Sequence, residues 1–363
     1  MSDGSDKQIY YSDYLKLDEL LQCQELESAR RGKVAHDEML FIVIHQAYEL
    51  WFKQIIWELS AVHRLFDSST VSEPSVGEAV HHLERITEIQ KVLVQQIDVL
   101  ETMTPLDFLD FRDALIPASG FQSVQFRLVE NMLGLRPQDR LTYGSGSYLS
   151  RLQEKHRKLL HESESRPSLF DLVDEWLSRT PFLDFGEFNF WSAYRQAVDK
   201  MLTQDKDSIE SNPLLSDENK EVQLKALRGT RTEFDSLFDR ELYDRLVADG
   251  KRRLSYNAFT AALLINLYRN QPILHLPFRM LTLLMDIDEL FARWRHRHAL
   301  MVSRMIGSKI GTGGSSGHNY LSKVAEHNRV FTDLFNLSTL YIPRSELPEL
   351  PKAVVEKMGF SLG

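Results

Sequence analysis

Two histidines in this sequence stand where a helix normally places an apolar side chain. His298 lies within IDELFARWRHRHALMVSRMIG, whose apolar residues recur at helical spacing. His45 holds the same kind of position in HDEMLFIVIHQAYELWFKQIIWEL. A histidine on an apolar face is most often a buried ring that bonds to the backbone or to a neighbouring side chain. The alternative is a metal ligand, because the neutral imidazole is the commonest one in proteins.

A glycine-rich segment, GTGGSSG, follows the helix that carries His298. Its backbone can turn tightly and approach a bound molecule, while Thr312 and two serines offer hydroxyl groups. Such a run is a weak signal alone. Its place directly after His298 indicates the wall of a pocket.

An arginine lies beside an aromatic and an aliphatic side chain in TPLDFLDFRDALIPASGF. Phe108, Arg112 and Leu115 are four and three residues apart, a spacing that gives them a shared face on a helix. Such an arginine usually pairs with a carboxylate of the protein itself. The alternative is the carboxylate of a ligand, which the planar guanidinium suits well.

These residues must be positioned by helices, because the chain shows long stretches of helical periodicity and almost no alternating pattern. It contains only 17 glycines and 12 prolines in 363 residues. We therefore predict an all-α fold. Four long helices are expected. One begins at Asp37, one spans Val76 to Glu101, one carries His298 and ends at Gly307, and one runs from Tyr320 to Phe335.

The expected organisation is one large helical bundle with a small helical insertion. The bundle comprises residues 1–185 and 252–363, and the insertion comprises residues 186–251, the most charged part of the chain. Residues 1–20 form an arm rich in tyrosine. Such arms often contact a neighbouring subunit.

Composition excludes several classes of partner. The net charge of −9, without a basic cluster, argues against nucleic acid and against an anionic membrane. The longest apolar run, Ala258 to Leu267, is about half of the ~20 residues that a membrane span needs. The single cysteine, Cys23, excludes an intramolecular disulfide, and no signal peptide is evident. We expect a cytoplasmic protein.

The sequence lacks the motifs of several common catalytic mechanisms. The sequence contains no HExxH, CxxC, GxSxG or phosphate-binding GxxxxGK[ST]. A di-iron bundle needs two ExxH pairs, and only Glu78 to His81 fits. Cys23 lies in an acidic segment, which disfavours a thiolate-ligated haem. Because CxxCH is absent, any haem must be held non-covalently.

The strings quoted above, together with VFTDLFNLSTLYIPR, closely resemble the tryptophan 2,3-dioxygenase family. The resemblance runs from about Tyr11 to about Pro351 and is weakest between Gly186 and Lys251. It implies an all-α homotetramer with haem b as a non-covalent cofactor. It also implies an enzyme of the kynurenine pathway that inserts both atoms of O2 across the indole C2–C3 bond of L-tryptophan, giving N-formylkynurenine.

The resemblance also assigns roles to residues of this sequence. It makes His298 the proximal haem ligand, with Trp294 beside the cofactor, and His45 the distal histidine that accepts a hydrogen bond from the indole N–H. It makes Arg112 the anchor of the substrate carboxylate, and places Thr312 beside the substrate's ammonium and carboxylate. It assigns Phe41, Phe108 and Leu115 to the walls around the indole, and Ser119 and Gly120 to the stretch near the haem. It assigns Tyr11 and Tyr14 to an arm that reaches the site from a neighbouring subunit.

One position departs from the family pattern, since His296 stands where the family often has tyrosine. His296 points about 200° away from His298 on a helix, so we keep His298 as the ligand. Two other functions are considered: an indoleamine dioxygenase of broader range, and a haem sensor or carrier without turnover. A distal histidine favours the tryptophan enzyme over the broader indoleamine dioxygenase. A haem sensor or carrier would give no role to Arg112 and Thr312.

Overall fold

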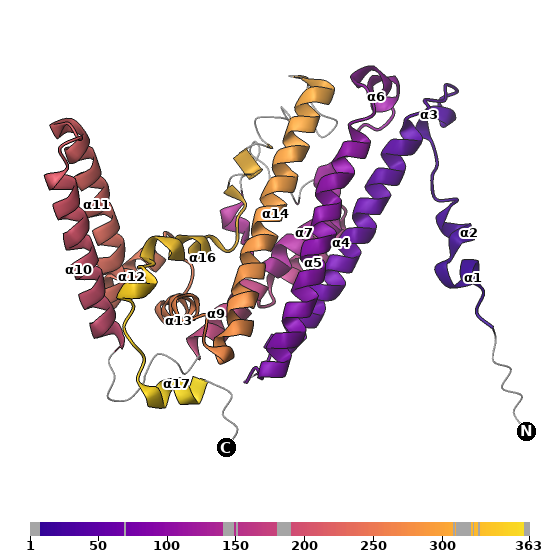
Figure 1. The fold of residues 1–363 in the computed structure, drawn as a ribbon. Helices are drawn as coiled ribbons and strands as arrows, with labels where there is room; N and C mark the ends of the chain where they lie inside the picture. Colours follow the sequence, from indigo (N-terminus) through magenta and orange to yellow (C-terminus); the bar gives the residue numbers. More distant parts are fainter. Residues whose placement is uncertain are drawn as a thin grey trace, which may run out of the picture.

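The structure is a computed structural model that describes residues 8–68, 70–140, 149, 152–179, 190–307, 309, 321, 323–325 and 327–358. Every regular element among these residues is a helix, which confirms the predicted all-α class. No helix in the described part of the chain is both long and apolar enough to cross a membrane. Three long helices, α4, α5 and α14, lie side by side at the centre (Figure 1).

The central helices are α4 (Glu38–Phe66), α5 (Glu73–Leu100) and α14 (His275–Ile306), and α5 packs against both others. The Ser72 hydroxyl caps α5 by accepting a hydrogen bond from the Ser75 N–H at 3.3 Å. Apolar side chains spaced three and four residues apart are buried between the helices. They include Phe52, Ile55 and Leu59 on α4, Leu83, Ile86 and Leu93 on α5, and Leu284, Ile287 and Phe291 on α14.

Shorter helices complete the bundle: α6 (Pro105–Arg112), α7 (Val124–Leu133), α8 (Glu154–Glu164), α9 (Leu169–Ser178) and α13 (Tyr256–Leu267). α7 ends at Gly134, where φ is +115°. A Cβ at Gly134 would come within 2.7 Å of the side chains of Phe170 and Ser168. Only glycine fits this helix end, because it tolerates both the backbone conformation and the close approach.

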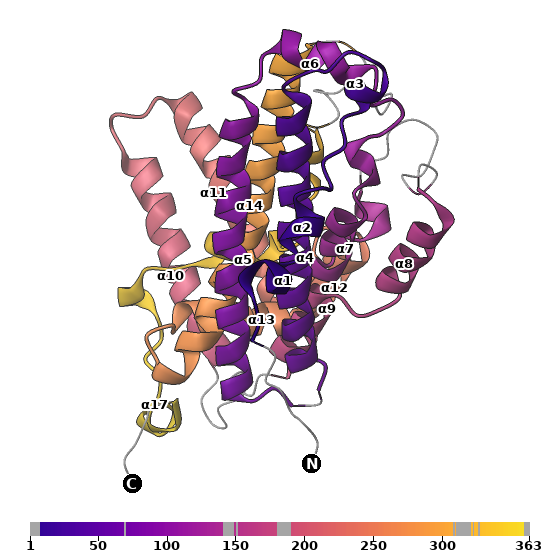
Figure 2. The ribbon, with the colours of Figure 1, turned by 90° about the vertical axis from the view of Figure 1, so that its right-hand side faces the viewer.

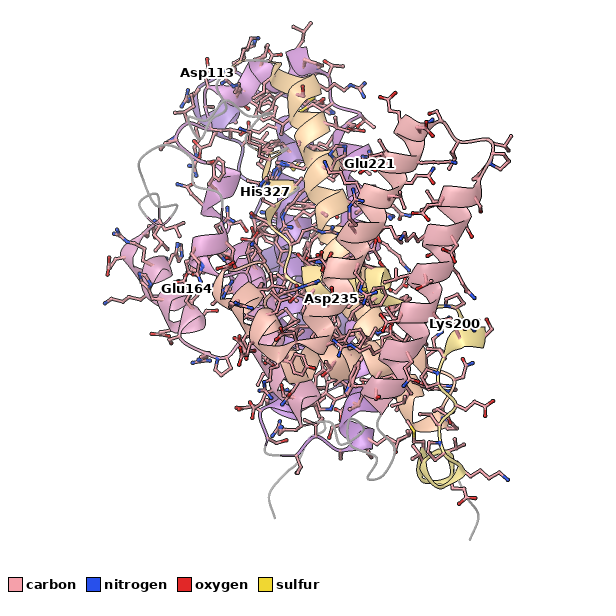
Figure 3. The ribbon with its side chains drawn as sticks, turned by 90° about the vertical axis from the view of Figure 1, so that its left-hand side faces the viewer. Asp113, Glu164, Lys200, Glu221, Asp235 and His327 are labelled. Carbon is pink, nitrogen blue, oxygen red and sulfur yellow. The ribbon has the colours of Figure 1, made fainter. Side chains whose placement is uncertain are left out.

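The charged region contains a helical hairpin, α10 (Phe190–Ser211) and α11 (Asp217–Phe238), followed by α12 (Arg240–Ala248). The hairpin stands away from the central helices, and Figure 3 shows Lys200, Glu221 and Asp235 along it. Apolar side chains near its base are buried in the main core. There the Tyr194 hydroxyl donates a hydrogen bond to the Leu340 carbonyl.

The predicted helix from Tyr320 to Phe335 is wrong, because the chain is not helical from Asn328 to Phe331. The Asp288 carboxylate on α14 accepts hydrogen bonds from the backbone N–H groups of Val330 at 3.0 Å and Phe331 at 3.1 Å. Those N–H groups therefore bond to α14 rather than within a continuous helix. Helices α16 (Thr332–Asn336) and α17 (Lys352–Met358) follow.

The N-terminal arm contains α1 (Tyr11–Leu15), α2 (Leu17–Leu20) and α3 (Glu27–Arg30). Its base is tied to the start of α4, since the buried Glu38 carboxylate accepts hydrogen bonds from the backbone N–H groups of Glu27 at 2.9 Å and Ser28 at 3.0 Å. No residue of α1 or α2 is buried. Gln46 on α4 also donates to the Cys23 carbonyl at 3.1 Å and accepts from Gln24 Nε2 at 2.7 Å, so the arm is attached to α4 from Cys23 onward.

Candidate active site

A cavity of about 320 Å³ lies between α4, α14 and the segment from α6 to α7. It is lined by both histidines that lie on apolar helix faces, His45 from α4 and His298 from α14. Its walls are mainly apolar and aromatic, with a few charged groups. The other lining residues are Phe41, Tyr48, Glu49, Phe52, Ile97, Leu100, Met103, Phe108, Arg112, Ser119, Gly120, Phe121, Ser123, Phe126, Arg127, Glu130, Trp294, Arg295, Met301, Val302, Met305, Ile306, Leu321 and Val324.

His298 presents a neutral imidazole to this cavity. Burial lowers the pKa of His298 to about 4, and the nearby His45 adds to the effect. The ring of Trp294, one turn earlier on α14, stacks on it with centroids 5.7 Å apart and planes 13° apart. The ring of His298 is therefore held in orientation and unprotonated at neutral pH, the form that binds metals.

His45 is oriented by its own helix. Its Nδ1 lies 2.6 Å from the Phe41 carbonyl oxygen, which can only accept, so Nδ1 carries the proton. The protein groups packed around the His45 ring lower its pKa by desolvation, although the hydrogen bond to Phe41 and the charge of Glu49 oppose this and the ring stays accessible from the cavity. Nε2 of the neutral ring then has its lone pair available as an acceptor.

A cluster of aromatic rings begins beside His45. The Phe41 ring lies 4.1 Å from the His45 ring and 5.8 Å from the Phe108 ring, centroid to centroid. The Phe111 ring packs edge-on to both Phe41 and Phe108. This end of the cavity can hold a flat apolar group.

Arg112 places a cationic group at the same cavity. It is the last residue of α6, whose start is fixed by a capping box between Thr104 and Asp107. Its guanidinium lies 3.8 Å from the carboxylate of Asp113, an exposed residue. A pair of that length to an exposed carboxylate is weak.

The segment from Ser119 to Ser123 forms another wall. The Ser119 hydroxyl accepts from the Phe121 N–H at 3.3 Å. Glu49 on α4 accepts from the Ser123 hydroxyl at 2.6 Å and from Gln125 Nε2 at 2.9 Å. Because Glu49 lies one turn after His45, these bonds fix the wall relative to the histidine.

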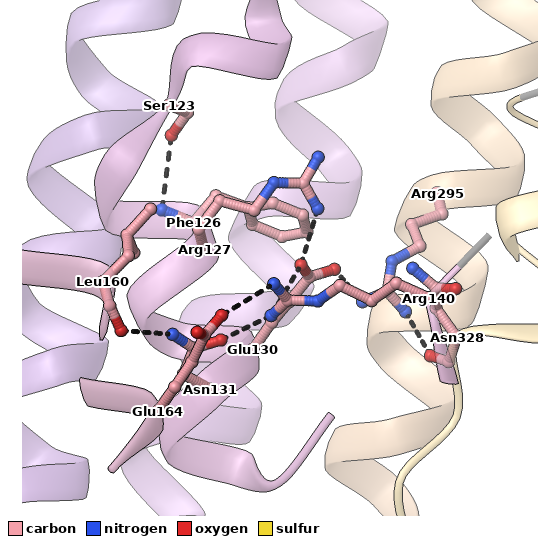
Figure 4. Close-up of polar contacts among 10 residues, drawn as sticks. All are labelled: Ser123, Phe126, Arg127, Glu130, Asn131, Arg140, Leu160, Glu164, Arg295 and Asn328. Atoms are coloured by element: carbon pink, nitrogen blue, oxygen red, sulfur yellow. Dashed lines mark hydrogen bonds and ion pairs between the residues drawn. The ribbon is translucent and has the colours of Figure 1, made fainter. Parts of the chain in front are cut away.

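A buried ionic network closes the far side of the cavity (Figure 4). The Glu130 carboxylate on α7 lies 2.6 Å from Arg127, 2.9 Å from Arg295 and 3.8 Å from Arg140. Burial alone would raise the pKa of Glu130, but the three guanidinium groups hold it at about 2. Arg295 also donates to the Asn328 carbonyl at 2.8 Å. The network joins α7, α14 and the segment after α14.

Sequence reasoning missed this network and the lining residue Glu49. The one available signal for Glu130 is an acidic residue within the amphipathic helix VQFRLVENML, where its neighbours Val129 and Leu133 are buried. Arg127 lies three residues before it on the same helix, a spacing that the sequence shows, but Arg295 comes from α14, and spacing in the sequence does not reveal that partner.

The structure brings eight of the twelve expected site residues to the cavity: Phe41, His45, Phe108, Arg112, Ser119, Gly120, Trp294 and His298. Leu115 follows the end of α6 and is not among the lining residues. Tyr11 and Tyr14 are exposed on α1. Thr312 lies outside the described residues. His296 is not among the lining residues either.

The donor groups fit haem better than a protein-bound metal ion. Among the described residues, no group of three or more His, Cys, Asp or Glu side chains could hold a metal. A lone neutral imidazole suits an iron that already has four ring nitrogens as ligands. Met301, Val302, Met305 and Ile306 add apolar walls next to His298, as a flat macrocycle requires.

Comparison with known proteins gives a consistent result. A family model described as tryptophan 2,3-dioxygenase matches residues 1–341. A tryptophan 2,3-dioxygenase of Bdellovibrio bacteriovorus is 52% identical over 352 residues, covering 97% of this chain and 98% of the relative. One from Dictyostelium discoideum is 50% identical, covering 99% and 90% of the two chains. One from Xenopus laevis is 47% identical, covering 95% and 85%.

Proposed function

Because this chain belongs to the tryptophan 2,3-dioxygenase family, we propose that it is a haem-dependent dioxygenase of tryptophan catabolism. It inserts both atoms of O2 across the indole C2–C3 bond of L-tryptophan to give N-formyl-L-kynurenine, the first step of the kynurenine pathway. The observation that carries this proposal is one mainly apolar cavity that is lined by two neutral imidazoles and by the Arg112 guanidinium.

The cofactor we propose is haem b, held non-covalently with His298 as its protein ligand. Trp294 fixes the orientation of the His298 ring, and Ser119 and Gly120 form the wall near the cofactor. When bound, ferrous haem supplies the binding of O2 and the oxygen chemistry. The protein supplies a dry pocket and the position of the substrate.

In this proposal His45 orients the indole rather than deprotonating it. Its Nε2 accepts one hydrogen bond from the indole N–H, because its Nδ1 proton is bound to the Phe41 carbonyl. The indole proton is far too weakly acidic for an ordinary imidazole to remove. Phe41 and Phe108 form walls that hold the flat ring in place, and Leu115, which does not line the described cavity, stays a predicted third wall.

Arg112 binds the substrate carboxylate through a charge-assisted hydrogen bond, and Thr312 lies beside the ammonium and carboxylate. This anchoring requires an amino acid rather than an amine. The requirement separates L-tryptophan from decarboxylated indoles. It also gives a role to the Arg112 cation, which lines the cavity near the aromatic side chain of Phe108.

The chain is further proposed to be a cytoplasmic homotetramer whose N-terminal arms exchange between subunits, bringing Tyr11 and Tyr14 to a neighbouring site. The negative net charge supports the absence of a nucleic-acid or membrane partner. The division into a haem domain at 1–185 and 252–363 and an insertion at 186–251 stays a prediction.

The test is substrate discrimination by the purified, haem-loaded protein under reducing conditions. L-Tryptophan should give a product with the absorption of N-formylkynurenine, and tryptamine should not. Turnover of both would indicate a broader indoleamine dioxygenase. A haem spectrum without product from either would indicate a sensor or carrier, and would refute the proposal.

A further inference from the structure

The end of α6 that carries Arg112 is bonded to the base of the N-terminal arm. Nη1 of Arg31 donates to the Asp113 carbonyl at 3.1 Å, and Nη2 donates to the Ala114 carbonyl at 3.2 Å. In the part of the chain that the structure describes, no backbone N–H donates to either carbonyl. The last carbonyl groups of a helix lack partners within that helix, and an arginine side chain can satisfy them. Arg31 therefore caps α6 from another segment of the chain.

The views of the fold place these two segments together. α3, which ends directly before Arg31, lies beside α6 at one end of the central helices in Figures 1 and 2. Asp113 lies at the same end in Figure 3. Lys33 adds a second contact, since its Nζ lies 3.3 Å from the Asp110 carboxylate on α6. Both side chains of that pair are exposed, so it adds little to the two bonds from Arg31.

Arg31 is itself held in place, because its segment is tied to the start of α4. The Glu38 carboxylate, 1% exposed, accepts hydrogen bonds from the backbone N–H groups of Glu27 and Ser28. The Ser28 hydroxyl accepts from the Ala35 N–H at 3.0 Å, which closes the loop between α3 and α4. The backbone N–H of Arg31 donates to the Glu27 and Ser28 carbonyls, at 3.2 Å each. A continuous series of hydrogen bonds therefore joins the start of α4 to the end of α6.

The other hydrogen bonds at this end of α6 are local. The Ala114 N–H donates to the Phe111 carbonyl at 2.8 Å, and the Leu115 N–H donates to the Arg112 carbonyl at 3.1 Å. These bonds shape the turn after the helix without joining it to another element. Phe111 is 1% exposed and holds the last turn of α6 in the core. The turn that follows is joined to the arm by Arg31.

We propose that Arg31 is a positioning residue that sets the separation between His45 and Arg112. α4 carries His45, and the bonds from Arg31 hold the end of α6 that carries Arg112 relative to the start of α4. This inference rests on the proposed function, in which His45 accepts the indole N–H and Arg112 binds the carboxylate. A substrate that is bound at both ends requires the two groups at the right separation, and small displacements are costly.

Isothermal titration calorimetry on the full, haem-loaded chain without O2 tests the proposal. Arg31→Ala should raise the Kd for L-tryptophan about three- to tenfold, because a displaced Arg112 keeps only part of its charge-assisted bond. Binding of 3-methylindole, which has no carboxylate, should not change. The control is Arg30→Ala, because the ion pairs of Arg30 with Glu25 and Glu27 stay within the arm. Equal weakening of both ligands, or by both variants, would overturn the proposal.

A double-variant cycle shows whether Arg31 acts through Arg112. In an Arg112→Ala background, Arg31→Ala should change the Kd for L-tryptophan by less than about twofold, since independent residues would give multiplied losses. A full additional loss would show that Arg31 does not act through Arg112.

Steady-state kinetics separate positioning from a general structural role. Arg31→Ala should raise KM for L-tryptophan and leave kcat within about twofold, because the indole is still oriented by His45. Arg31→Lys keeps the charge but loses the two-pronged donor, so its KM should lie between those of Arg31→Ala and the unmodified chain. A fall in kcat with KM unchanged would contradict the positioning role.

Hydrogen exchange measures the bonds from Arg31 without any ligand. The N–H groups of Ala114, Leu115 and Ala118 are hydrogen-bonded within the turn after α6. Arg31→Ala should speed their exchange at least about fivefold and leave the centre of α4 unchanged, because only the turn loses a restraint. Exchange in the turn that equals that of the unmodified chain would refute the restraint.

The same preparations separate this inference from the proposed function, because formation of N-formylkynurenine by the unmodified chain is measured beside the affinities. Absence of product together with the expected pattern of Kd values contradicts the function alone. Product together with a Kd that Arg31→Ala leaves unchanged contradicts the inference alone. An unmodified chain that does not bind L-tryptophan contradicts both.

Discussion

The rings of Trp294 and His298 stack with centroids 5.7 Å apart and planes 13° apart, one turn from each other on α14. Trp294 is itself fixed by the rings of Phe126, at 5.2 Å, Tyr48, at 5.8 Å, and Phe52, at 6.1 Å. The orientation of the proposed haem ligand thus depends on an aromatic cluster that joins α4, α7 and α14.

Replacing Trp294 should therefore weaken haem binding without removing the ligand. Trp294→Ala takes away the stacked ring and leaves a void, which should cost about 3 kcal/mol of stability. Its apoprotein should bind haem about tenfold more weakly in a titration followed by the Soret band. Trp294→Phe keeps a flat ring and should lie close to the unmodified protein. Equal loss in both variants would show that stacking is not the cause.

His45 and Arg112 should differ in what they contribute to turnover. His45→Ala removes one orienting hydrogen bond and should lower kcat while leaving measurable activity. Arg112→Ala removes a charge-assisted bond worth roughly 1.5 to 3 kcal/mol, so KM for L-tryptophan should rise about 10- to 100-fold. Steady-state kinetics on both variants check the order. An inactive His45→Ala beside a normal Arg112→Ala would mean that the two roles are assigned wrongly.

The Glu130 network should make stability depend on acid pH. The pKa of Glu130 is about 2 in the fold, below its ordinary value of 4.5. The unfolded chain therefore takes up this proton first. The stability that Glu130 contributes is present above about pH 4.5 and is lost as pH falls toward 2.

Urea unfolding from pH 7 to pH 3.5 measures this effect. Glu130→Gln leaves Arg127, Arg140 and Arg295 without their shared carboxylate and should cost about 3 to 5 kcal/mol at pH 7. Its stability should fall less steeply below pH 4.5 than that of the unmodified chain. Glu289→Gln, which breaks an exposed pair with Arg293, should change stability by less than about 1 kcal/mol. Parallel pH profiles of stability for Glu130→Gln and Glu289→Gln would contradict the role assigned to Glu130.

Helical periodicity predicted the all-α fold and the inward direction of His45 and His298, because each of these depends on one helix. The structure places both histidines on one cavity. Their shared location depends on how α4 packs relative to α14. The spacing of residues within either helix gives no information about that packing. The family resemblance, rather than periodicity, supplied the expectation that the two act together.

Features that depend on contacts between distant segments could not be predicted in this way. The break at Asn328 to Phe331 arises from the Asp288 carboxylate, some forty residues earlier on α14. Glu130 gains its low pKa from Arg127 on its own helix and also from Arg295 on α14 and Arg140, and the sequence does not show that Arg295 lies beside it. The apolar spacing of Val43, Leu50 and Trp57 was readable in the sequence, but only the structure shows that this second face of α4 is exposed.

The most direct test of the account is the haem content of His298→Ala compared with His296→Ala. The two residues lie two positions apart on α14, and only His298 lines the cavity. Haem stoichiometry, measured from the Soret band of the purified, helical protein, should fall close to zero for His298→Ala and stay near one per chain for His296→Ala. Full haem content and normal tryptophan turnover in His298→Ala would contradict the account.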